Sequence, residues 1–241
     1  MFSVVGKMVN YQYTYLIGDL ILLIIWLALF LRRKDTRKEM LIIGICFGLA
    51  TILTYAAYAE DWWRPLTLTG ESNFSVEDFL FGFFIGGISA VIYEHLFNKR
   101  IKIKNVKKLK DKKRNISLLI ILFLMAAIFL VSFFILGNNS LKSTIAAFVI
   151  PTLIIYKKRP DLIKNSLVSG VLILALSIVG YNILNLITPG FFDQFWLFEN
   201  IGRKIFLGIP LEEYVFYLLL GMFVGPLYEY WKEGKLINIK K

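Results

Sequence analysis

Two pairs of adjacent carboxylates stand out in this chain, because each pair opens a long apolar run. Glu77 and Asp78 lie in "FSVEDFLF", and Glu212 and Glu213 lie in "GIPLEEYVF". Ionisable side chains at membrane depth are costly and usually mark a functional site. Apolar surroundings disfavour the charged form of a carboxyl group, and a neighbouring carboxylate disfavours it further. One member of such a pair can hold a proton while the other accepts one, which predicts acid–base chemistry.

The two acidic pairs belong to a longer repeated pattern that includes aromatic residues. A shift of 135 positions superposes the pairs and also superposes the Tyr-Glu dipeptides at 93–94 and 228–229. At 3.6 residues per turn, the first acid of each pair shares a helix face with phenylalanines, and the rings can stabilise a cation. Small residues at 82, 86 and 90 mark the opposite face of the first helix as a helix-packing surface. The predicted substrate contacts are Phe81, Phe84, Phe216, Phe223, Trp63 and Trp196.

A simpler explanation exists for acids at these positions. Acidic residues in a first turn complement the helix dipole, and Ser75 and Pro210 are typical residues for the start of a helix. This explanation accounts for one acid per helix, but less well for two adjacent acids in both copies. The tryptophans likewise suit an aromatic belt at the membrane interface.

The composition predicts an all-α integral membrane protein. Of the 241 residues, 57% are hydrophobic and 19% are charged, whereas soluble domains carry about 25% charged residues. The net charge of +11 comes from short basic runs between apolar segments. That distribution is a topology signal rather than a nucleic-acid footprint, so no nucleic-acid partner is expected. A single cysteine, Cys46, excludes an intramolecular disulfide.

Seven apolar runs approach the roughly 20 residues that cross a bilayer. They fall at 13–31, 40–59, 76–97, 116–136, 141–156, 167–187 and 208–231. Six spans are the alternative, because the fifth run is short and contains Pro151. Basic residues follow every second run, which places the N-terminus outside, the C-terminus in the cytoplasm and the chain in the cell membrane. The long basic run after the third span is expected to touch lipid head groups.

The repeat predicts three parts of the chain. Residues 1–97 form a first three-helix repeat, 98–136 a basic loop with a connector helix, and 137–241 a second repeat. One connector helix gives both repeats the same orientation, so they are expected to be parallel and related by a pseudo-two-fold axis. Sites in such proteins tend to lie between the halves.

These motifs resemble the lycopene cyclase domain family, in its fused single-chain form. The family phrase P-[LI]-E-[ED]-x-x-F is met in full by "PLEEYVF", and by "SVEDFLF" except that Ser75 replaces the proline. The loops "EDWWRPLTLTG" and "FFDQFWLFENIGRKIFLG" are also similar to family loops.

The resemblance implies a cyclase that closes β-ionone rings on linear carotene ends without net redox change. Its acid and base residues would be Glu77, Asp78, Glu212 and Glu213. The implied partners are a carotenoid substrate in the bilayer, membrane lipids and other carotenoid pathway enzymes. No G-x-G-x-x-G opens a helix after a strand, so no dinucleotide cofactor is implied, and no metal is expected.

Three other classes compete with this interpretation. A retinal protein needs a lysine in the last helix, and 208–231 contains none. A Glu-Glu intramembrane protease would need an arginine where Tyr217 stands, and the only histidine, His95, lies at the far end of its helix. A transporter or scaffold would place its acids nearer the middle of the helices. Asn182 and Asn185 are candidate partners of the motif carboxylates, or helix–helix contacts.

Overall fold

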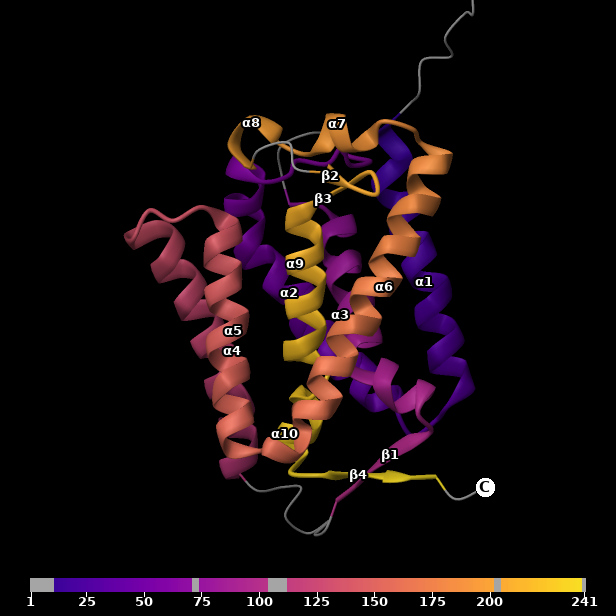
Figure 1. Cartoon of the computed structure of the whole chain (residues 1–241), viewed down its shortest axis with the longest axis vertical. Helices are drawn as coiled ribbons and strands as arrows, with labels where there is room; N and C mark the ends of the chain where they lie inside the picture. The colour runs from indigo at the N-terminus through magenta and orange to yellow at the C-terminus, as the bar shows by residue number, and fades with distance from the viewer. Residues whose placement is uncertain (1–10, 71–73, 104–111, 202–204, 240–241) are drawn as a thin grey trace, which may run out of the picture.

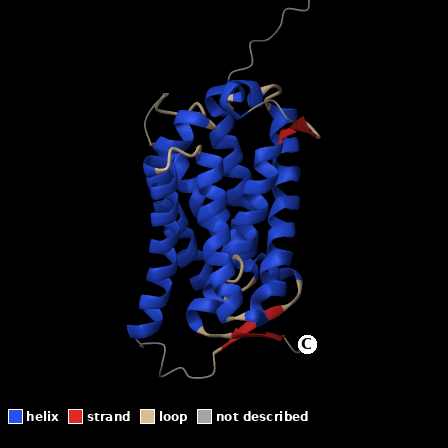
Figure 2. Cartoon of the chain, turned by 60° about the vertical axis from the view of Figure 1, so that its left-hand side comes forward, coloured by secondary structure: helices blue, strands red, loops and turns tan. Residues whose placement is uncertain are grey.

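The chain folds into a bundle of long helices. The computed structural model describes residues 11–70, 74–103, 112–201 and 205–239. Within these residues, seven helical segments are long and apolar enough to cross a membrane (Figures 1 and 2). This confirms seven candidate spans rather than six and a nearly all-α fold, whereas the sidedness and the symmetry of the repeats stay predictions.

The first half of the chain and the connector contribute four of the spans. They consist of η1 (Tyr11–Tyr13), α1 (Thr14–Arg32), α2 (Arg37–Asp61), α3 (Val76–Leu96), α4 (Lys112–Leu130) and the π-helix η3 (Val131–Ile135). The second half contributes α5 (Ser140–Lys158), η4 (Pro160–Leu162), α6 (Ile163–Ile187), α9 (Leu211–Val224) and α10 (Leu227–Lys232). The short helices α7 (Phe191–Phe195) and α8 (Phe198–Ile201) lie across the upper end of the bundle in Figure 1.

Two prolines have different effects on the spans. Pro151 lies inside α5, which continues through it to Lys158. The seventh span, predicted as one helix, is divided into α9 and α10 at Gly225 and Pro226. Proline has no backbone N–H and clashes with the preceding turn, which favours such a break.

Two short antiparallel sheets were not predicted. β1 (Lys99–Lys102) pairs with β4 (Lys235–Asn238) at the lower end of Figure 1, and β2 (Ile205–Phe206) pairs with β3 (Ile209–Pro210) just before α9. β1 occupies the start of the predicted basic loop, so part of that loop is a strand. Residues 104–111 of the loop lie outside the described residues.

Glycines set the close packing of the two motif helices. A Cβ atom on Gly82 of α3 would lie 2.7 Å from the backbone oxygen of Phe47 in α2. A Cβ atom on Gly221 of α9 would lie 2.6 Å from the backbone oxygen of Ser169 in α6. Each motif helix therefore packs against the preceding long helix through small residues, as the sequence predicted for α3.

Candidate active site

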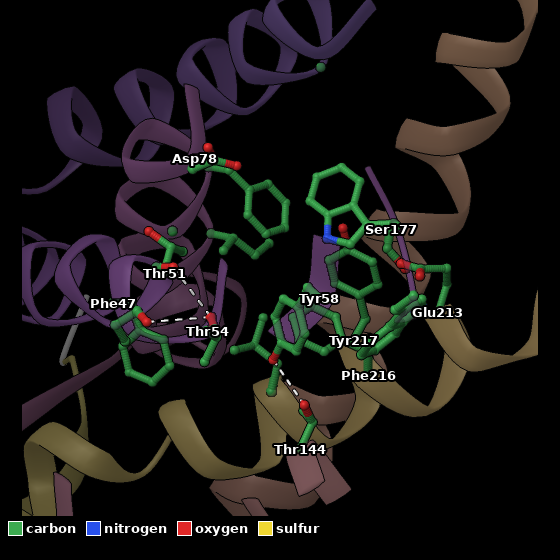
Figure 3. A pocket seen from close by; sticks show the side chains of 18 of the residues that line it. Phe47, Thr51, Thr54, Tyr58, Asp78, Thr144, Ser177, Glu213, Phe216 and Tyr217 are labelled. Carbon is green, nitrogen blue, oxygen red and sulfur yellow. Dashed lines mark hydrogen bonds between the residues drawn. The ribbon is translucent and has the colours of Figure 1, made fainter. Parts of the chain in front are cut away.

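An apolar cavity of about 200 Å³ lies among the spanning helices. Its lining comes from both halves of the chain and includes one carboxylate of each motif, Asp78 of α3 and Glu213 of α9. Figure 3 shows these two side chains on opposite sides of the pocket, with Tyr58 and Tyr217 near the middle of the view and Phe216 below Glu213. The second acid of each motif therefore faces the cavity.

Asp78 is fixed by the start of its own helix and by α1. Ser75 caps α3, and its backbone N–H and hydroxyl both donate to Asp78 Oδ2 at 2.8 Å. The Tyr15 hydroxyl donates to Asp78 Oδ1 at 3.1 Å. The N-cap predicted for Ser75 is thus confirmed, and it forms a full capping box. Both oxygens of Asp78 have donors that stabilise the carboxylate form.

Glu213 is held by side chains from the second half. The Tyr181 hydroxyl of α6 donates to Glu213 Oε2 at 2.7 Å, and the Trp196 indole N–H donates to Oε1 at 2.9 Å. The hydroxyls of Tyr181 and Tyr217 are 3.1 Å apart, so a second tyrosine joins this network. Pro210, at the N-cap of α9, offers no side-chain cap. The two motifs therefore position equivalent carboxylates by different means.

The first acid of each motif is buried but does not line the cavity. Glu77 Oε1 accepts the backbone N–H of Leu68 at 2.8 Å, which fastens the loop before α3 to its first turn. Glu212 Oε2 is buried and has no hydrogen-bond partner among the described residues. Both acids thus stand beside the cavity rather than in its wall.

Asp19 of α1 is a third carboxyl group of the cavity, and the sequence analysis missed it. Its side chain is only 2% exposed, and neither oxygen has a hydrogen-bond partner within the part of the chain that the structure describes. Its electrostatic neighbours are Glu77 and Asp78. The signal was a single acidic residue in an apolar span, which by itself marks a functional candidate.

The predicted aromatic contacts divide into two groups. Phe81, Phe216, Trp63 and Trp196 line the cavity, and the two tryptophan rings lie 5.7 Å apart. Phe84 and Phe223 are packed in the hydrophobic core outside that lining. The sequence placed Phe81 with Phe84, and Phe216 with Phe223, on one helix face. It could not distinguish cavity contacts from core contacts, because each helix has neighbours on several sides. Tyr15, Tyr58, Tyr181 and Tyr217 line the cavity and were not predicted.

The two asparagines expected near the motif do not bind its carboxylates. Asn182 donates to the backbone oxygen of Ile178, and Asn185 accepts from the backbone N–H of Gly190. The neighbouring Tyr181 provides the α6 contact instead. His95 is buried at the opposite end of α3, and its Nε2 lies 3.0 Å from the hydroxyl of Thr36.

The cavity combines acids, hydroxyls and aromatic faces in apolar surroundings. Among the described lining residues there is no lysine, arginine or histidine. Such a site cannot neutralise a phosphate or another anion, but it can donate protons, accept protons and stabilise a cation. Most of its wall is apolar, which suits a hydrocarbon ligand.

The comparisons with known proteins gave one match. The family model described as "Lycopene cyclase" matches residues 10–96 and 139–231. These two segments contain both acidic motifs and leave out the basic connection and α4. No curated protein and no solved structure matches the chain.

Proposed function

Because the chain belongs to the lycopene cyclase family, we propose that it converts the linear ψ-ends of a carotene into β-ionone rings. The observation that carries the proposal is the apolar cavity in which Asp19, Asp78 and Glu213 lie among aromatic rings. Family membership supports a carotenoid cyclase in general, and the cavity supplies the groups that this reaction needs.

The reaction is an isomerisation with a balanced proton count. A carboxyl group donates a proton to the terminal double bond of the carotene and leaves a tertiary cation. The electrons of a nearby double bond attack this cation and close a six-membered ring, so the positive charge moves onto the ring. A carboxylate then removes a ring proton, and the new double bond forms. One proton enters and one leaves, and no electron donor or acceptor takes part.

Hydrogen bonding distinguishes the three acids. Asp78 and Glu213 accept hydrogen bonds on both oxygens, and such donors stabilise a carboxylate. Asp19 has no donor among the residues that the structure describes, and an ionised carboxylate there would be buried without compensation from them. We therefore assign the initial proton donor to Asp19, and the base and cation-stabilising roles to Asp78 and Glu213. Glu77 and Glu212, beside the cavity, would support Asp78 and Glu213.

Aromatic rings would stabilise the cationic intermediates. Phe81 and Phe216 come from matched positions of the two motif helices and both line the cavity. Trp63 and Trp196 add two further faces, and their backbones form a bridge. A cation over an aromatic face gains about 0.5–2 kcal/mol, so several rings together would lower the barrier to ring closure.

The cavity size fits one end of a long substrate. Pockets for small molecules usually measure about 300–1,000 Å³, and this cavity measures about 200 Å³. We infer that one carotene end enters while the rest of the chain stays in the lipid of the cell membrane. A desaturating enzyme would supply the linear substrate, and the two halves, 1–97 and 137–241, would enclose the site together with the connector helix α4.

The test is expression of the full chain in a bacterial host that accumulates lycopene, with pigment analysis by liquid chromatography. Conversion of lycopene to products with β-rings is the expected result. Unchanged lycopene in cells whose membranes contain the protein, detected by an affinity tag, would refute the proposal. Transport or scaffolding would leave the pigment unchanged, and a protease would give no new pigment.

A further inference from the structure

Three buried carboxylates meet at the end of the bundle opposite the motif. Glu39 lies in the first turn of α2, Glu94 in the last turn of α3 and Glu229 in α10; we call these three residues the carboxylate triad. One carboxylate oxygen from each lies within 4.8 Å of the others. The residues are only 2%, 2% and 0% exposed. None of them belongs to the cavity wall.

Each residue of the triad has an oxygen whose charge is uncompensated. Glu39 Oε1, Glu94 Oε1 and Glu229 Oε2 are buried without a hydrogen-bond partner, as far as the described residues go. The other oxygen of Glu229 accepts from the Asn165 amide at 2.8 Å. Three buried acids that come this close, each with an oxygen that has no hydrogen-bond partner among the described residues, point to a positively charged ligand.

The nearest arginines make their shortest ion pairs elsewhere. Arg33 lies 3.9 Å from Glu94 but 2.6 Å from Asp35, and this pairing lowers the pKa of the Asp35 carboxyl. Arg159 lies 2.7 Å from Asp161 and donates to the backbone oxygen of Glu229 rather than to its carboxylate. Within the described residues, these two arginines therefore balance only part of the negative charge of the three carboxylates.

The predicted repeat would account for this arrangement. Glu94 and Glu229 are 135 positions apart, like the motif acids. The ion pairs Arg33–Asp35 and Arg159–Asp161 recur at a spacing of 126 residues, and at that spacing Asn165 corresponds to Glu39; its neutral amide contacts Glu229. A glutamate at position 165 would bring four acids together. Because Asn165 stands there instead, three acids and one neutral amide meet.

We propose that the carboxylate triad binds one hard divalent cation of the Ca²⁺, Mn²⁺ or Mg²⁺ class. Carboxylate and amide oxygens are the ligands such ions prefer. Calcium takes oxygens at about 2.3–2.6 Å, so oxygens on opposite sides of it lie about 5 Å apart, in line with the spacing of the triad. The ion would join α2 and α3 of the first half to α10 of the second.

The first test is manganese binding by the purified full chain in detergent micelles, stripped beforehand with EDTA. Electron paramagnetic resonance reports free Mn²⁺, and Ca²⁺ and Mg²⁺ are added as competitors. We expect about one Mn²⁺ per chain, and at least a tenfold loss of affinity in Glu39→Gln and in Glu229→Gln. Glu60→Gln is the matched control, because Glu60 is an exposed carboxylate on the same helix as Glu39.

Thermal stability is the second measurement, and it keeps the test decisive if a triad variant folds less well than the native chain. The thermal midpoint of native protein, followed by tryptophan fluorescence, should rise by several degrees with Mn²⁺ or Ca²⁺. Glu229→Gln should be as stable as native protein in EDTA, because repulsion within the triad falls, and should gain nothing from the ions. Absence of both binding and stabilisation in native protein would overturn the proposal, as would binding that survives both triad substitutions. Neither result depends on cyclase activity.

Discussion

At one end of the bundle, Asp78 and Glu213 accept hydrogen bonds from serine, tyrosine and tryptophan side chains. At the other end, Glu94 and Glu229 face each other and Glu39, with few donors. Both pairs recur at the same spacing of 135 residues. The same repeated helix thus provides carboxylates for two environments, separated on α3 by about 24 Å of helix rise. Donors and open apolar space suit proton chemistry, whereas converging oxygens without donors suit a cation.

Asp19 provides the strongest test of this comparison. It lies in the cavity assigned to proton chemistry, but it has no hydrogen-bond donor among the described residues. If it supplies the initial proton, Asp19→Asn should lower β-ring formation by about 100-fold to 10,000-fold, the usual contribution of general acid catalysis. The measurement is product per unit of membrane-inserted protein in the lycopene-accumulating host. Glu60→Gln should match the native chain. Full activity of Asp19→Asn would move the donor role to another acid.

Substitution of the second acid of each motif, which lines the cavity, should lower product more than substitution of the first acid, which lies beside the cavity. Asp78→Asn and Glu213→Gln remove groups of the cavity wall and should each cost at least about 100-fold in product. Glu77→Gln and Glu212→Gln alter groups beside the wall and should cost less than about tenfold. Chromatography of the same pigments measures all four variants. A larger loss of product in Glu77→Gln and Glu212→Gln would show that the first acid of each motif, and not the second, reaches the substrate.

The tyrosine that holds Glu213 should have a smaller effect. A hydrogen bond to a charged group contributes about 1.5–3 kcal/mol. Trp196 still donates to Glu213 in Tyr181→Phe, so we expect a loss near the lower value: kcat should fall about tenfold and KM should stay nearly unchanged. Lycopene in liposomes with the purified chain allows both constants to be measured. Tyr156→Phe is the control, since its hydroxyl bonds to Ser166 outside the cavity wall. Equal losses in both variants would indicate general destabilisation.

The sequence predicted the features that repeat or depend on hydropathy. The seven spans follow from runs of apolar residues, and the motif acids follow from a spacing of 135 residues. The cap of α3 was predictable because Ser75 and Asp78 are three residues apart, and capping is a local interaction.

Contacts between distant helices were beyond the sequence. Asp19 meets the motif only because α1 packs beside α3, and one acid in an apolar run has no fixed partner. Asn182 and Tyr181 are neighbours in the chain but point about 100° apart on α6, so choosing between them required the packing. β1 pairs with β4 across more than 130 residues, and no local pattern in the basic run indicates a strand.

The helix that joins the two carboxylate regions provides the prediction with the smallest effect on cyclisation. Gly221 lies between Glu213 and Glu229, and a Cβ atom there would meet the α6 backbone at 2.6 Å. Gly221→Ala should therefore destabilise the fold by about 1–3 kcal/mol, as overpacking usually does, with less than about threefold loss of product at low growth temperature. Gly180→Ala on α6 is the matched control for stability but not for product, because its Cβ would meet nothing within 4 Å while Gly180 lines the cavity.

The thermal midpoint of each purified variant in detergent measures this difference. Alanine favours a helix over glycine by about 1 kcal/mol, so Gly180→Ala should be as stable as the native chain or more stable. Gly221→Ala should lose stability and should also weaken Mn²⁺ binding, because α9 leads into α10 and Glu229 at the triad. A Gly221→Ala protein with native stability would mean that α9 can shift on α6, and that the two carboxylate regions are not held at a fixed separation.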